Sequence, residues 1–134
     1  MAEYATVTAA LAMLASSLTG AFGSALPSTD AKAVSIVSAV ARSHHVSGSR
    51  ARGAYEEAPY RKPALRYLYT VGWVSAASDL NSCKAAQLLG PDPAVAAAQA
   101  LRGSPKTLAL LRAAHLTVGQ AAAAVARGTT DGCA

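Results

Sequence analysis

The chain has 134 residues, of which 34 are alanine and only 14% are charged, with a formal net charge of +5. This length corresponds to one domain, and a chain of about 100–150 residues buries enough surface for a core of its own. Low charge with apolar composition excludes a disordered chain, and the glycine and cysteine contents exclude collagen-like and disulfide-scaffold classes. Because alanine is the best helix former, we predict an all-α fold. It should be a compact array of six or seven short alanine-rich helices, forming a single domain over residues 1–134.

The first predicted helix spans residues 3–22, where the larger side chains recur at intervals of three and four residues. Its other face carries hardly any charge, so we expect a second surface to cover it. Self-association through this helix is therefore one hypothesis, and it makes the protein a structural assembly component.

Capping residues, proline and glycine delimit the later helices. One helix should begin at a Ser28 or Thr29 cap, run towards His44 and stop at Gly48. A short helix is expected over 51–58, and Pro63 should open a longer one that breaks near residue 78 or continues to 89.

The last three predicted helices each follow a turn-forming segment. They cover 93–101, 105–114 and 117–128, and the last should begin with a capping box of Thr117 and Gln120 and end at Gly128. We detect no internal repeat of fixed period in the sequence.

The segment 116–128 resembles the first helix of a helix-turn-helix DNA reader. That resemblance implies a recognition helix after it, for which only residues 129–134 remain. If 116–128 were itself the recognition helix, Gln120 and Arg127 could reach base edges. Nucleic acid is therefore retained only as an alternative partner.

The most informative stretch is 50–69, which holds four of the five tyrosines together with five basic residues. Within it, the predicted ligand-binding residues are Arg50, Arg52, Tyr55, Tyr60, Arg61, Lys62 and Arg66. Arg61 and Lys62 directly precede the helix opened by Pro63, where a cation costs about 0.3–1 kcal/mol unless something negative offsets it.

Two partners for these cations are open. Glu56 and Glu57 could fold back on them, which would be a purely structural arrangement. Alternatively, an external anion binds there, either a small ligand with a phosphate or carboxylate group or an acidic protein surface.

A catalytic role is the alternative for other polar residues. His44 or His45 could act as an acid–base group with Glu56 or Glu57, in a hydrolase or nuclease-like enzyme acting on a phosphate-containing substrate. Asp79 interrupts an apolar stretch and could be a general base or a helix cap. Since no metal-ligand spacing occurs, we predict neither a metal nor a cofactor.

Cys83 and Cys133 form no CxxC pair. They are either two reduced thiols in a cytoplasmic protein or one disulfide that attaches the C-terminal tail to the body, which requires an oxidising compartment. The positive segment of a secretory signal is absent, so a secreted protein requires that Met1 was placed on a mature chain. No apolar run is long enough to predict a membrane span.

From the sequence we favour a non-enzymatic binding module that recognises an acidic protein surface or a small anionic ligand through the region 50–69. The small enzyme and the assembly protein are the alternatives.

Overall fold

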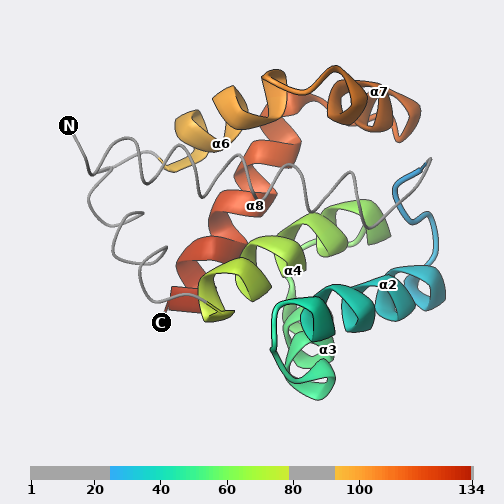
Figure 1. Cartoon of the computed structure of the whole chain (residues 1–134). Helices are drawn as coiled ribbons and strands as arrows, with labels where there is room; N and C mark the ends of the chain where they lie inside the picture. The colour runs from blue at the N-terminus through green and yellow to red at the C-terminus, as the bar shows by residue number, and fades with distance from the viewer. Residues whose placement is uncertain (1–24, 79–92, 134) are drawn as a thin grey trace.

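Six α-helices are described by the computed structural model, which covers residues 25–78 and 93–133 (Figure 1). They are α2 (Asp30–Ser43), α3 (Gly48–Glu57), α4 (Pro63–Ser78), α6 (Pro93–Arg102), α7 (Pro105–Ala113) and α8 (Val118–Cys133). The predicted all-α fold is confirmed, and these two ranges contain no strand. The predicted helix over 3–22, and with it the self-association hypothesis, lies outside the described residues.

The helix starts follow the capping residues that the sequence indicated. The side chains of Thr29 and Ser104 each accept the backbone N–H three residues further on, which begins α2 and α7. Thr117 and Gln120 form the predicted capping box, since each side chain accepts the other residue's backbone N–H, at 3.0 and 3.1 Å. These local hydrogen bonds explain why the boundaries could be predicted without knowledge of the fold.

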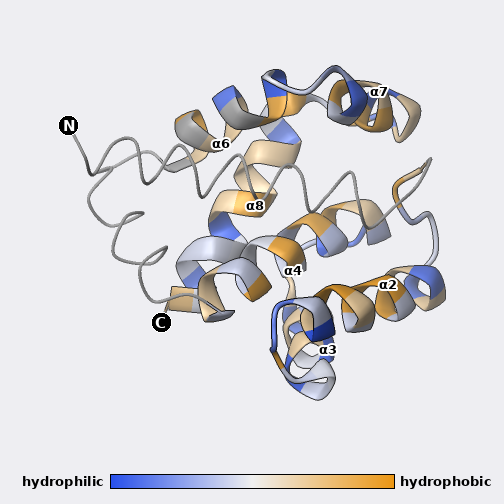
Figure 2. Cartoon of the chain, viewed as in Figure 1, coloured by the Kyte–Doolittle hydropathy of each residue, from blue (hydrophilic) through white to orange (hydrophobic). Residues whose placement is uncertain are grey.

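The helices α4 and α8 lie against each other at the centre, with α2 and α3 packed on α4 and with α6 on α8 (Figure 1). One hydrophobic core joins side chains from all the described helices. Figure 2 shows that apolar residues colour α2 and α8, whereas α3 is largely polar. No single described helix meets the length and hydropathy of a membrane span; α7 and α8 do so only as a pair bent by 101°.

The contact between α4 and α8 is made backbone to backbone at three glycines. A Cβ atom added to Gly72 would overlap the carbonyl group of Val125, and one added to Gly128 would overlap that of Tyr69. A Cβ at Gly132 would lie 2.5 Å from the carbonyl oxygen of Trp73. No residue other than glycine fits at this separation of the two helices.

Two predicted helix ends are wrong, and both concern glycine. Gly128 does not end the last helix, because it lies inside α8 at the contact with α4 and the helix continues to Cys133. Gly48 does not stop the second helix but begins α3. The residue that turns the chain after α2 is His45, whose φ of 58° is left-handed.

The same helix corner occurs twice, 70 positions apart, although the sequence showed no fixed-period repeat. Residues 41–50 and 111–120 have identical secondary structure and an identical pattern of burial, and His115 has the same φ of 58° as His45. The hydrogen bonds correspond too, since the N–H groups of Val46 and Leu116 donate to the carbonyls five residues back, at 2.8 and 2.9 Å. The shared pattern is Arg-x-x-His, then Val or Leu, then Ser or Thr.

We predict that Gly128→Ala lowers the free energy of unfolding by about 3 kcal/mol or more, because the added methyl forces α4 and α8 apart. Urea unfolding followed by circular dichroism measures this. The matched control is Gly53→Ala in α3, where an added Cβ meets nothing within 4 Å. That change should raise stability by about 0.5–1 kcal/mol. If the two substitutions change the free energy of unfolding equally, the close backbone contact between α4 and α8 is contradicted.

Candidate ligand-binding site

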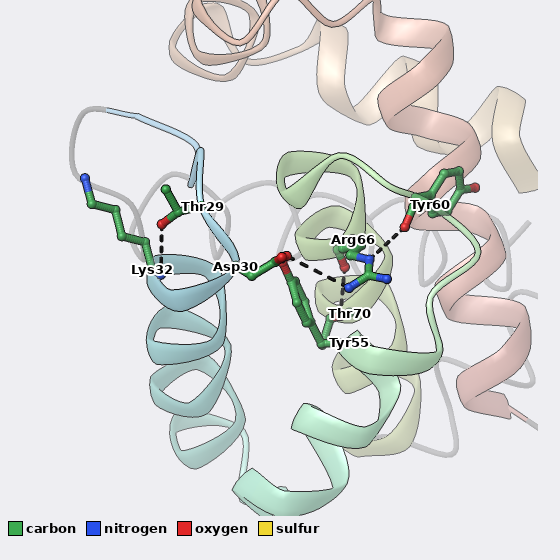
Figure 3. Close-up of polar contacts among 7 residues, drawn as sticks. All are labelled: Thr29, Asp30, Lys32, Tyr55, Tyr60, Arg66 and Thr70. Atoms are coloured by element: carbon green, nitrogen blue, oxygen red, sulfur yellow. Dashed lines mark hydrogen bonds and ion pairs between the residues drawn. The ribbon is translucent and has the colours of Figure 1, made fainter.

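The basic stretch 50–69 does not form one surface, because part of it is used inside the fold. The Tyr55 hydroxyl donates to Asp30 Oδ1 at 2.5 Å, and the guanidinium of Arg66 lies 3.9 Å from the same oxygen (Figure 3). Arg66 also stacks over the Tyr55 ring at 5.5 Å and donates through Nε to the carbonyl of Tyr60 at 2.7 Å. Tyr55 and Arg66 therefore hold α2, α3 and α4 together, and the negative partner of Arg66 is Asp30.

Two further members of the predicted set also contact aromatic rings of α4. The Tyr60 ring lies 6.3 Å from that of Tyr69, and the Arg50 guanidinium lies 5.3 Å from the centre of the Trp73 ring. Arg50 and Arg52 are exposed on α3. Because Trp73 is ten residues along α4 from Pro63, or about 15 Å at 1.5 Å per residue, Arg50 is separated from the helix start.

A second Tyr–Asp–Arg group joins α4 to α8. The Tyr69 hydroxyl donates to Asp131 Oδ2 at 2.5 Å, and Arg127 Nε lies 3.5 Å from that oxygen. Arg127 was a candidate for reading bases, but it pairs within its own helix. The face of α8 formed by Ala121, Ala124 and Val125 is buried, so α8 is a core helix and not an exposed recognition helix.

Arg61 and Lys62 remain for an external partner. Both are exposed, and within the described part of the chain neither forms an ion pair or a side-chain hydrogen bond. The alternative ion pairs with Glu56 and Glu57 do not form, since both carboxylates are exposed on α3 and the ion pairs between described residues involve Asp30 and Asp131.

Lys62 also occupies the N-cap position of α4, because its carbonyl accepts the N–H of Arg66 at 3.0 Å. A lysine side chain has donors but no acceptor, so it cannot cap the free N–H groups of the first turn. The start of α4 therefore combines these N–H groups with two cationic side chains.

A cavity of about 450 Å³ lies beside Lys62. It is open to solvent and is built from three separate segments: the chain before α2, the start of α4 and the end of α7. Lining residues that bear on its chemistry are Leu26, Pro27, Ser28, Lys62, Leu110 and His115. His115 is not among the binding residues predicted from the sequence, and the sequence signal for it is the Arg-x-x-His pattern shared with the α2–α3 corner.

The candidate catalytic residues are not brought into contact. His44 is the half-buried C-cap of α2 and His45 is exposed beyond it. No hydrogen bond or ion pair joins either histidine to Glu56 or Glu57 in the described structure. Asp79 lies outside the described residues. Among those that are described, no three potential metal ligands cluster.

The predicted bridge between Cys83 and Cys133 stays a prediction, because Cys83 lies outside the described residues. Cys133 was expected in an irregular tail. It is instead the half-buried last residue of α8.

Burial and hydrogen bonding raise the pKa of three tyrosines. Burial is the main cause at Tyr55, Tyr67 and Tyr69. The bonds to Asp30 and Asp131 further raise the pKa of Tyr55 and Tyr69, because a phenolate would lose the hydrogen bond to the carboxylate and would be repelled by its charge.

Alkaline pH should therefore unfold the protein. An unfolded tyrosine loses its proton near pH 10, whereas these three keep theirs while folded, so stability falls as pH rises above about 10. The free energy of unfolding should fall by about 1.4 kcal/mol per pH unit for each of the three tyrosines, or about 4 kcal/mol per pH unit together. Tyr67→Phe should reduce this slope by about a third. Urea unfolding between pH 8 and 11.5, with tyrosinate absorbance, measures this. Ionisation of all five tyrosines while the helical circular dichroism persists would contradict it.

Asp30→Ala should lower the free energy of unfolding by about 1–3 kcal/mol, because it leaves the buried Tyr55 hydroxyl without its acceptor and Arg66 without its carboxylate. Asp30→Asn keeps an acceptor oxygen and should cost less. A double-mutant cycle of Asp30→Ala with Tyr55→Phe isolates the pair, and a coupling energy of zero would show that the hydrogen bond adds nothing.

Comparison with known proteins supplies no relative for this chain: no family model, curated protein or solved structure matches it.

Proposed function

We propose that the protein is a non-enzymatic binding module that holds a small anionic ligand at the start of α4. The observation that carries the proposal is the pair Arg61 and Lys62, two exposed cations that have no carboxylate partner in the described structure. They stand at a helix N-terminus, where each is unfavourable by about 0.3–1 kcal/mol in the absence of an anion.

The local chemistry suits a phosphate or carboxylate group. An anion at this place meets the ammonium of Lys62, the guanidinium of Arg61 and the free N–H groups of the first turn of α4. The hollow beside Lys62 supports a small ligand over an acidic protein surface, because it provides room for one molecule and not a flat area for a partner. Among the described residues no comparable observation favours an enzymatic function, and the helix on which the assembly hypothesis depends lies outside them.

The test is the double substitution Arg61→Ala with Lys62→Ala. We expect the response to inorganic phosphate to weaken at least ten-fold, since charge-assisted hydrogen bonds are lost. The free energy of unfolding should at the same time rise by about 1 kcal/mol, because two unfavourable cations leave the helix N-terminus. Amide chemical shifts of Ala64 and Leu65 report binding, and urea unfolding reports stability.

The matched control is Arg102→Ala with Lys106→Ala, which removes two exposed cations from the corner where α6 ends and α7 begins. Phosphate binding should be unchanged in this control. If both double variants lose phosphate binding equally, the change in net charge explains the loss, and the proposal is contradicted. Tighter Arg61- and Lys62-dependent binding of polyglutamate than of phosphate would assign the site to an acidic protein surface instead.

A further inference from the structure

We infer that the ligand is an amphiphilic organic acid, a single molecule with an apolar body and one anionic head, of the size of a medium-chain carboxylic acid. This inference rests on the proposed function, because it places the head at Lys62. It adds the chemical class of the rest of the ligand.

The walls of the cavity beside Lys62 are mainly hydrocarbon. Leu26 and Pro27 before α2, and Leu110 and Ala113 in α7, contribute apolar surface from two segments of the chain. A cavity of about 450 Å³ lies within the range of roughly 300–1,000 Å³ found for sites that hold small organic molecules. An inorganic anion gains nothing from such walls, whereas an alkyl or aromatic body removes their surface from water.

The described lining carries charge of one sign. Among residues 25–78 and 93–133, those that line the cavity include Lys62, His115 and Ser28 but no aspartate or glutamate. Asp30 follows two residues after Ser28, and its carboxylate is already held by Tyr55 and Arg66. An acid therefore meets a cation and hydrogen-bond donors in the lining, and no carboxylate among the described lining residues repels it.

The shape favours a free molecule over a membrane or a peptide. The hollow is open to solvent and is bounded by the residues before α2, by the start of α4 and by the last turn of α7, so it does not run as one groove along a single helix. We commit to a monomeric acid as the occupant. Binding to a lipid surface is an outcome that the test distinguishes.

The experiment compares acetate, hexanoate, octanoate and uncharged octanol by calorimetry on the full chain. We expect affinity to rise several-fold with each added pair of methylenes, and octanoate to bind at least ten-fold more tightly than octanol. Lys62→Ala should reduce octanoate binding to the level of octanol. Ala113→Phe, which fills the cavity, should abolish the chain-length dependence while leaving the phosphate response of Ala64 and Leu65 intact.

Ala123→Phe is the control, since Ala123 is exposed on α8 and away from the cavity. If acetate and octanoate bind equally, or if Ala113→Phe has no effect on octanoate, the inference is overturned while the proposed anion site stands. If Lys62→Ala changes the binding of neither phosphate nor any acid, both this inference and the proposed anion site fail. The protein could instead sediment with phosphatidylglycerol vesicles in a way that requires Lys62 and that octanoate does not inhibit. That result would overturn the monomeric ligand in favour of a lipid surface.

Discussion

The close contact between the backbones of α4 and α8 is the constraint on which the rest of the structure depends. Gly72, Gly128 and Gly132 remove the side chains that would separate the two helices, and the remaining helices pack on the outer sides of this pair. An alanine-rich chain needs such a contact, because alanine buries little apolar area per residue. The helices must approach closely for dispersion forces between many small groups to offset the entropy of ordering the chain.

Buried tyrosines compensate for the shortage of large aliphatic side chains, and each brings a hydroxyl that must be satisfied. The same solution occurs twice: Tyr55 with Asp30 and Arg66, and Tyr69 with Asp131 and Arg127. These groups use two of the seven acidic residues of a chain whose net charge is +5. Asp30 and Asp131 are therefore used to join helices of the fold, and neither is paired with Arg61 or Lys62.

Helix boundaries could be predicted where a local hydrogen bond determines them, as at Thr29, Ser104 and Thr117. Prediction failed at Gly128, because glycine ends one helix and permits a close contact in the middle of another, and nothing adjacent in sequence distinguishes the two. For the site, the sequence placed Arg61 and Lys62 directly before Pro63, and their role in binding stays a prediction; Glu56 and Glu57, which are near in sequence, do not pair with them in the described structure. The carboxylate that pairs with Arg66 is Asp30, which lies 36 positions earlier in the chain.

The sequence by itself determined the helical class, most of the helix starts and the position of two cations at a helix N-terminus, because each of these follows from composition or from contacts within a few residues. Only the tertiary structure decided which basic residues stay unpaired and where a hollow opens beside them. Both depend on segments that are far apart in the chain and come together only in the folded structure, so the order of charges along the sequence does not reveal them.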